Sequence, residues 1–183
     1  CIVMKTLYID SHNDIDIVLF EDGVVLRHQE VLDKKKNSTY LFPTIKEVLN
    51  DEVIDSIIVV NGPGSFTGVR LGVTIAKTLA YTLNIPIKTV SSLLCRKLSS
   101  KEENFAISDG NGYFLGIFNS DNTLKEDYKY LSNKDFLEYT KTNKVETNVT
   151  LDYESIYNYC LSEKSINPHI VNPIYIKKIG VEE

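Results

Sequence analysis

The chain has no tryptophan, one methionine and three cysteines, and no two of the cysteines stand in a Cys-x-x-Cys pair. Three dispersed thiols, Cys1, Cys95 and Cys160, exclude a disulfide framework and a thiolate zinc site, and they favour a reducing cytoplasm. The longest apolar runs, such as Ile57–Val60, are too short to span a bilayer, so we expect no membrane partner. We also expect Met4 to be the natural start, with no secretory signal before it.

Positive charge is scarce as well. The 183 residues include 20 Lys and Arg against 25 Asp and Glu, which gives a net charge of −5. A chain this acidic is a poor candidate for gripping a nucleic-acid backbone by itself. The three histidines form no His-x-x-x-His pair, so we expect no metal site. Hydrophobic residues make up 43% and charged residues 25%, which is typical of a globular protein of one domain or two small ones.

The hydrophobic pattern predicts the order β-β-β-α-β-α-β-α for the first hundred residues. Ser38 is a candidate cap for the first helix, and Ser91 or Ser92 for the third. The continuous apolar run Ser56–Val60 is typical of a strand buried on both faces of a parallel sheet. The predicted strands are 5–9, 15–20, 24–31, 56–60 and 87–90, and the predicted helices are 40–49, 68–83 and 92–98.

The order of elements then restarts, which predicts a duplication. Two regions, 4–100 and 101–183, are the expected domains, and the second is the shorter. Asp10 and Asp109 each follow the first strand of their half and precede a polar turn. The predicted strands of the second half are 105–108, 113–118 and 124–131, followed by a helix over 133–142, an extended segment over 145–151 and a helix over 153–161.

Four of the nine glycines fall in the run Asn61–Gly72. A glycine-rich loop between a buried strand and a helix can present backbone N–H groups to an anion. Val69 stands where a Walker loop needs lysine, and Thr67 stands where a dinucleotide loop needs its third glycine. Two readings stay open: a ligand-binding loop, or a tight turn in which Phe66 anchors in the core. The candidate nucleotide-adjacent residues are Gly62, Pro63, Gly64, Ser65, Phe66, Thr67, Gly68 and Arg70.

The helix 68–83 has a stripe of small residues at every fourth position, formed by Gly68, Gly72, Ala76 and Ala80. Its apolar arc covers about half the circumference, more than an ordinary surface helix shows. Small residues let another backbone approach closely. That neighbour is either the chain's own helix 40–49 or a helix of a partner protein. The candidate interface residues are Leu41, Ile45, Gly72, Val73, Ala76, Lys77 and Ala80.

The sequence GPGSFTGVRLGVTIAKTLAYTLNIPIKTVSSL, residues 62–93, closely resembles the TsaB (YeaZ-type), glycoprotease-like family of bacterial proteins. Weaker agreement covers 4–10, 40–49 and 173–178. The resemblance implies an α/β fold of the duplicated actin-like ATPase (ASKHA, ribonuclease H-like) class, with two β-β-β-α-β-α subdomains of which the second is shortened. The segments Asn37-Ser38-Thr39 and Asp109-Gly110-Asn111-Gly112 depart from the family's usual His-Ser-Glu and Asp-Ala-Arg-Arg.

The resemblance also implies a function. Proteins of this family are non-catalytic subunits needed for threonylcarbamoyladenosine at adenosine 37 of ANN-decoding tRNAs. They bind a catalytic TsaD-type paralogue, are joined by a TsaE-type ATPase, and pair with themselves when alone. Contact with tRNA is then expected only through the complex. No cofactor of the chain's own is expected, although a nucleotide at the joint with the partner is left open.

The alternative function is an active ATPase or small-molecule kinase of the same fold class. Asp10, Asp109 and the loop at Gly62 would then hold magnesium and phosphate, whereas the simpler interpretation is that aspartates favour turns. Such enzymes also need glycine-rich backbone around the adenine in their second half. No glycine occurs between Gly116 and Gly180, which argues against this alternative.

Overall fold

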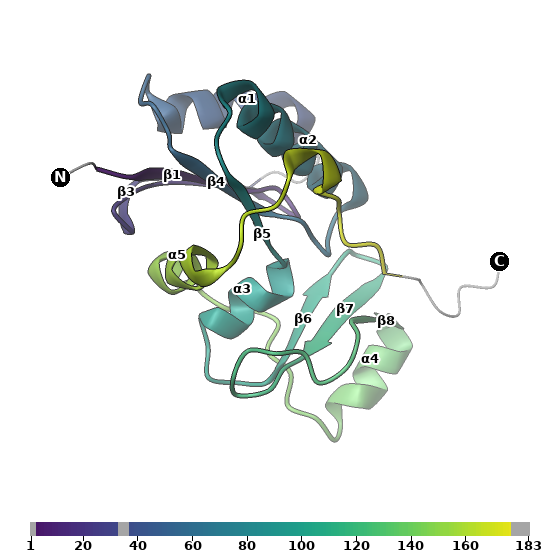
Figure 1. Cartoon of the computed structure of the whole chain (residues 1–183). Helices are drawn as coiled ribbons and strands as arrows, with labels where there is room; N and C mark the ends of the chain where they lie inside the picture. The colour runs from purple at the N-terminus through teal and green to yellow at the C-terminus, as the bar shows by residue number, and fades with distance from the viewer. Residues whose placement is uncertain (1–2, 33–36, 177–183) are drawn as a thin grey trace.

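A computed structural model describes residues 3–32 and 37–176. Its elements form two sheets, one of five strands and one of three, each with helices on both sides (Figure 1). The first sheet has the order β3-β2-β1-β4-β5, with β1 antiparallel to β2 and parallel to β4. Its strands are β1 (Lys5–Asp10), β2 (Ile15–Glu21), β3 (Val24–Val31), β4 (Ser56–Val60) and β5 (Ile87–Val90). The strand predictions for this half are confirmed, with ends within one residue.

The central strands of this sheet are buried on both faces, and alternate residues belong to different cores. Leu7 and Ile9 of β1 pack beneath α1 (Asn37–Leu49) and α2 (Phe66–Leu83), which cover one face. Tyr8, in contrast, points into a second core formed with α3 (Ser92–Leu98) and α5 (Tyr153–Ser162) on the opposite face (Figure 1). The continuous apolar runs of β1 and β4 follow from this two-sided cover.

Serine side chains cap the N-termini of two helices in the first half, α2 and α3. The Ser65 side chain accepts from the Gly68 backbone N–H, so α2 begins at Phe66, two residues earlier than predicted. Asn84 ends α2 in the left-handed conformation. Ser91, one of the two residues predicted to cap the third helix, accepts a hydrogen bond from the Leu94 N–H at the start of α3. Ser38, the predicted cap of the first helix, lies inside α1 instead.

The small-residue stripe of α2 faces the chain's own sheet, which corrects the predicted partner interface. A Cβ at Gly72 would collide with the Ser11 hydroxyl and approach Ile9 on β1. Lys77 is the exception: it is half-buried and faces the C-terminal segment. The close approach that small residues permit is therefore between α2 and β1. The predicted interface residues that the structure buries in this core are Leu41, Ile45, Gly72, Val73, Ala76 and Ala80.

The second sheet repeats part of the first. Its order is β6-β7-β8, and α4 (Asn133–Thr140) covers one face. Its strands are β6 (Asn104–Ser108), β7 (Gly112–Ile117) and β8 (Lys129–Ser132). The third strand predicted over 124–131 is thus mostly loop, apart from one bridge between Phe118 and Leu124.

The predicted extended segment 145–151 contains no strand, but it has a remnant of one. Glu146 forms an isolated parallel bridge with Phe105 of β6. Its N–H donates to the Asn104 carbonyl and its carbonyl accepts from the Ala106 N–H, both at 2.9 Å. In the first sheet β4 occupies the corresponding place, parallel to the first strand. The duplicated α/β fold class is confirmed. The division at residue 100 stays a prediction, and α5, which follows it, packs on the first sheet.

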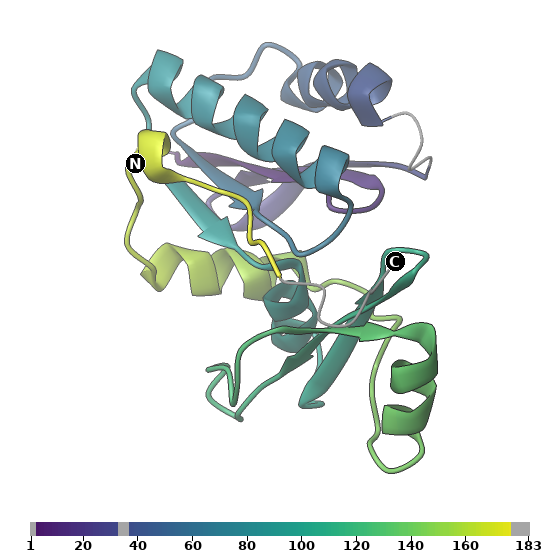
Figure 2. The ribbon, with the colours of Figure 1, turned by 90° about the vertical axis from the view of Figure 1, so that its right-hand side faces the viewer.

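The C-terminal segment, residues 164–176, returns to the first sheet and runs beside α2 (Figures 1 and 2). The Ile166 N–H donates to the Ile87 carbonyl at 2.8 Å, which adds a short bridge to β5. The Lys77 ammonium donates to the carbonyls of His169, in the short helix η2 (Pro168–Ile170), and Val171, at 3.3 and 3.1 Å. This segment therefore covers the side of α2 on which Lys77 lies.

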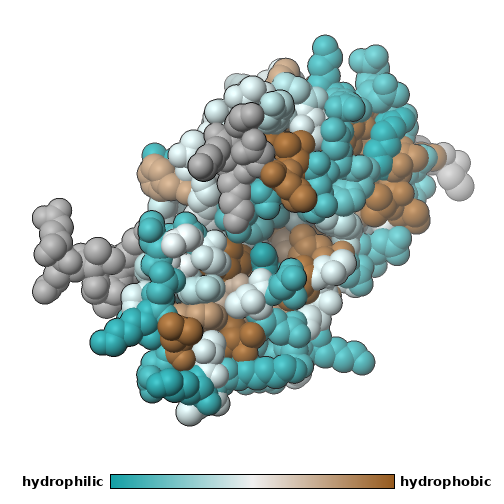
Figure 3. Space-filling view, turned by 180° about the vertical axis from the view of Figure 1, so that it is seen from behind, coloured by the Kyte–Doolittle hydropathy of each residue, from teal (hydrophilic) through white to brown (hydrophobic). Residues whose placement is uncertain are grey.

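On the face turned away in Figure 1, apolar residues gather in several patches separated by hydrophilic ones (Figure 3). Scattered apolar residues of this kind are ordinary on protein surfaces and do not by themselves mark an interface. Across residues 3–32 and 37–176, no helix combines the length and the apolar character needed to cross a bilayer.

The burial of Ala76 gives a test of this packing. Ala76 is fully buried between α2 and the sheet, so Ala76→Arg should place an unpaired charge in an apolar core and lower the free energy of unfolding by about 3–5 kcal/mol. Urea unfolding followed by circular dichroism measures the change. Thr78→Arg, at an exposed position two residues along the same helix, is the control and should leave stability within about 0.5 kcal/mol. Equal stability of the two variants would contradict the burial of the stripe.

Candidate functional site

The glycine-rich loop packs tightly on the turn between β1 and β2. The Ser65 N–H donates to the His12 carbonyl at 2.6 Å, and a Cβ on Gly64 would lie only 2.5 Å from that same oxygen. On its other side the loop is held by Ser92, whose hydroxyl donates to the Pro63 carbonyl at 2.6 Å and whose N–H donates to the Gly62 carbonyl at 2.9 Å. Much of the loop backbone thus serves packing between β1, α2 and α3.

The alternative in which Phe66 anchors this turn in the core is wrong, because the Phe66 side chain is 61% exposed. It instead stacks beneath the Arg70 guanidinium, which lies 3.7 Å from the ring centroid. Arg70 also donates through Nε to the Tyr175 hydroxyl at 3.2 Å. Phe66, Arg70 and Tyr175 thereby form one wall of a cavity.

This cavity has a volume of about 560 Å³ and lies between the glycine loop, the turn after β6 and the end of the C-terminal segment. Six of the eight predicted loop residues line it, the exceptions being Gly62 and Gly68. Its only charged lining residues within the described chain are Arg70 and Asp109. The full lining is Asn13, Pro63, Gly64, Ser65, Phe66, Thr67, Val69, Arg70, Ser108, Asp109, Gly110, Phe114, Pro173, Ile174, Tyr175 and Ile176.

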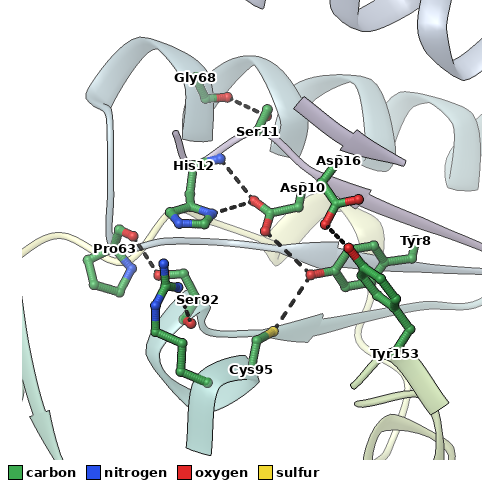
Figure 4. A network of polar contacts seen from close by, with 11 residues as sticks. Tyr8, Asp10, Ser11, His12, Asp16, Pro63, Gly68, Ser92, Cys95 and Tyr153 are labelled. Carbon is green, nitrogen blue, oxygen red and sulfur yellow. Dashed lines mark hydrogen bonds and ion pairs between the residues drawn. The ribbon is translucent and has the colours of Figure 1, made fainter. Parts of the chain in front are cut away.

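Asp10 ends β1 as predicted, and its carboxylate is engaged inside the protein (Figure 4). Its Oδ1 accepts from the His12 N–H at 2.9 Å and lies 2.6 Å from His12 Nδ1. Its Oδ2 accepts from the Tyr8 hydroxyl at 3.4 Å, and that hydroxyl lies 3.8 Å from Cys95 Sγ. Asp10 is only 2% exposed, so a ligand would have to displace these groups to reach it.

Two nitrogens beside Asp10 lack partners among the described residues: His12 Nε2 and Arg96 Nε. Burial lowers the pKa of Arg96, while the Asp10 charge opposes that effect. The Arg96 guanidinium still donates through Nη1 to the Ser92 carbonyl at 3.1 Å. The polar link between the end of β1 and α3 is the Tyr8 hydroxyl, which contacts both Asp10 and Cys95. The sequence reasoning singled out neither His12 nor Arg96, which are 84 positions apart.

A second buried carboxylate, Asp16, lies opposite Asp10 in the β1–β2 register. Burial and the nearby Asp10 charge raise the pKa of Asp16 to about 6. Its Oδ2 accepts from the Tyr153 hydroxyl of α5 at 2.6 Å, and its Oδ1 lies 2.8 Å from His28 Nε2. No local pattern in the sequence indicates this group, because Tyr153 is 137 positions from Asp16.

Asp109 follows β6, in the place that Asp10 has after β1. Its Oδ1 accepts from the backbone N–H groups of Asn111 and Gly112 at 2.9 and 3.0 Å, as expected of an aspartate in a turn. The Tyr130 hydroxyl donates to it as well, at 2.9 Å. Burial and this carboxylate raise the pKa of Tyr130 to about 12. Both strand-end aspartates thus make the internal hydrogen bonds that the turn interpretation predicts.

The fold and the site together define an actin-like α/β protein. The carboxylates at the ends of its first strands, Asp10 and Asp109, accept hydrogen bonds from groups of the same chain. Comparison with known proteins agrees with that class. A family model described as TsaD, tRNA N6-adenosine threonylcarbamoyltransferase, matches residues 32–107. A structure from Pseudomonas aeruginosa, an uncharacterized protein with similarity to peptidase YEAZ, is similar with a TM-score of 0.75 at 16% identity, covering 95% of this chain and 100% of its own.

Two curated proteins named tRNA threonylcarbamoyladenosine biosynthesis protein TsaB are similar in sequence. The Bacillus subtilis protein is 43% identical over 96 residues, which are 49% of this chain and 42% of that protein. The Escherichia coli protein is 33% identical over 97 residues, which are 50% of this chain and 42% of that protein. The matches thus span less than half the length of these relatives. They confirm the resemblance to TsaB (YeaZ-type) proteins that the Gly62–Gly72 run predicts.

The contact between Gly64 and His12 gives a test of the loop. A methyl group at Gly64 would collide with backbone rather than with a movable side chain, so Gly64→Ala should destabilise the protein by about 1–3 kcal/mol. Thr67→Ala, at an exposed position in the first turn of α2, is the control and should change stability by less than about 0.5 kcal/mol. Thermal unfolding compares the two. An unchanged melting temperature for Gly64→Ala would show that the loop does not pack on this turn.

Proposed function

We propose that this protein is a non-catalytic subunit in the biosynthesis of threonylcarbamoyladenosine on tRNA, acting in the cytoplasm through a TsaD-type catalytic paralogue. The similarity to TsaB proteins over about half of this chain supports the process. The TsaD family model, which matches residues 32–107, includes the whole glycine loop and α2. A TsaE-type ATPase would complete the assembly. The net charge of −5 supports contact with tRNA through the complex rather than by this chain alone.

The observation that carries the non-catalytic role is the state of Asp10. An enzyme of this fold class needs that carboxylate free to hold a metal–phosphate group, but here it is 2% exposed and bound by His12 and Tyr8. Asp109 is similarly occupied by its own turn and by Tyr130. These contacts weigh against the ATPase or kinase alternative.

A bound nucleotide fits the cavity poorly. Among the described residues that line it there is one cation, Arg70, and that guanidinium already stacks on Phe66 and bonds to Tyr175. A polyphosphate would meet Asp109 on the opposite wall. We therefore do not propose a nucleotide bound in this cavity. The expectation that the chain has no cofactor of its own stays a prediction.

The partner surface we propose is the outer face of α1 and α2, in place of their buried stripe. Phe42 on α1 is 57% exposed, and Thr74 and Thr78 lie at the centre of the exposed side of α2. The two helices pack side by side on the same face of the sheet (Figure 2). This face offers a second helix pair a surface of apolar and small polar side chains. When the paralogue is absent, the same face would pair two copies of this chain.

The catalytic alternative has a direct test. The purified protein should hydrolyse ATP no faster than a buffer control, and Asp10→Asn should leave that background unchanged. Release of inorganic phosphate measures the rate, with a known ATPase of this fold class as a positive control. A turnover near one per second that is lost in Asp10→Asn would overturn the non-catalytic role and establish the ATPase.

The partner surface is tested by Thr78→Arg and Phe42→Glu, which place charges on the outer face without touching the core. We expect both variants to fold, to lose co-purification with the organism's TsaD-type protein, and to fail to restore threonylcarbamoyladenosine in cells depleted of the native protein, as measured by mass spectrometry of digested tRNA. Leu137→Arg on α4, at a position that is 66% exposed, is the matched control and should behave as wild type. Normal pairing by both α1 and α2 variants would place the partner elsewhere.

A further inference from the structure

Three metal-ligating side chains converge at the edge of the first sheet. Asp16 comes from β2, and His28 and Glu30 come from β3. The register pairs Asp16 with Glu30 and Val18 with His28, so all three side chains project from the same face of the hairpin. One ligand atom from each lies within 4.8 Å of the other two. No ligand motif in the sequence marks this group, because the pairing of two strands assembles it.

A hydrogen bond from α5 orients the Asp16 carboxylate. Its Oδ2 is held by the Tyr153 hydroxyl at 2.6 Å, which leaves Oδ1 directed at His28 Nε2, 2.8 Å away (Figure 4 shows the Asp16–Tyr153 contact). The Asp16 side chain is 11% exposed, whereas that of His28 is 34% exposed and Glu30 is exposed. The group therefore has one buried anchor and an open side toward solvent.

Negative charge is concentrated around this group. Asp10 lies opposite Asp16 on β1, and Glu30 lies opposite it on β3, so three carboxylates follow one another across three neighbouring strands. Like charges placed directly opposite each other destabilise a sheet. The Tyr153 hydroxyl facing them cannot supply positive charge, and His28 supplies at most one. A divalent cation would balance the charge more fully.

We propose that Asp16, His28 and Glu30 bind a zinc ion. One imidazole nitrogen and two carboxylate oxygens are a donor set that suits Zn²⁺, whereas Mg²⁺ and Ca²⁺ favour oxygen donors alone. Donors of a tetrahedral zinc site lie about 3.3–3.6 Å apart, so donors already within 4.8 Å need only small side-chain movements. The ion replaces the His28–Asp16 hydrogen bond. The imidazole coordinates through Nε2 and carries its one proton on Nδ1, any proton on Nε2 passing to water, and a water molecule takes the fourth position.

Tyr153 is the positioning residue of this site. It orients Asp16 from α5, an element that follows the second sheet in the chain, and its ring packs 4.9 Å from that of His28. A zinc ion on the hairpin edge therefore also strengthens the contact between the first sheet and α5. We expect zinc to stabilise the folded protein, since a ligand that binds only the native state raises its melting temperature.

Zinc titration by isothermal calorimetry tests the proposal, with Cys1→Ser as the background because a thiol outside the cluster can itself bind zinc. We expect one ion per chain with a dissociation constant in the micromolar range. His28→Ala and Glu30→Gln should each weaken binding by at least about tenfold, the scale on which zinc-site mutations act. His169→Ala removes a histidine outside the cluster and should bind as the background protein does.

Cobalt(II) absorption and the melting temperature test the same site in two further ways. Cobalt(II) should give visible absorption bands of a tetrahedral site in the background protein and lose them in His28→Ala. The melting temperature should rise by several degrees in excess zinc, and Tyr153→Phe should reduce both this rise and the affinity. All variants are compared by circular dichroism, and Glu30→Gln, at an exposed position, is the one least prone to misfold. Absence of one-to-one binding, or equal binding by the background protein and His28→Ala, would overturn the site.

Discussion

Two-sided burial of β1 and β4 is the constraint on which the rest of the structure depends. Helices α1 and α2 cover one face of these strands, and the opposite face is closed by α3 together with α5. Ile156 and Cys160 of α5 are fully buried against that face, next to Tyr8. The first sheet is therefore completed by a helix that begins 63 positions after the end of its last strand, from Val90 to Tyr153. The two halves thus depend on each other for a closed core.

The close approach of α2 to β1 determines the geometry of the site. A Cβ at Gly64 would collide with the His12 backbone, and a Cβ at Gly72 would displace the Ser11 hydroxyl. These two contacts bring the glycine loop onto the turn after β1. The backbone groups of the loop are then partly used in packing. Phe66, Arg70 and Tyr175 form one wall of the cavity beside the loop.

The polar residues at the ends of the first strands illustrate how one fold can hold carboxylates for different purposes. Asp10 and Asp109 occupy corresponding places in the two halves, and each bonds to its own turn and to a tyrosine. A buried carboxylate is tolerated only when such partners compensate for lost hydration. These two aspartates thus stabilise the end of β1 and the turn after β6. Asp16, in contrast, directs one carboxylate oxygen at His28 on the edge strand β3.

Local patterns in the sequence by themselves determined most elements, because alternation, apolar runs and serine caps act over a few residues. Strands 24–31, 56–60 and 87–90 match the structure at both ends. The sequence could not place the segment 145–151, since a single bridge to β6 depends on a distant partner. Nor could helical periodicity show whether the small residues around Ala76 on α2 face the chain's own sheet or a partner protein. Small residues are buried in either kind of contact. Only the tertiary structure decided that question, and only strand register and the return of α5 brought Asp16, His28 and Tyr153 together.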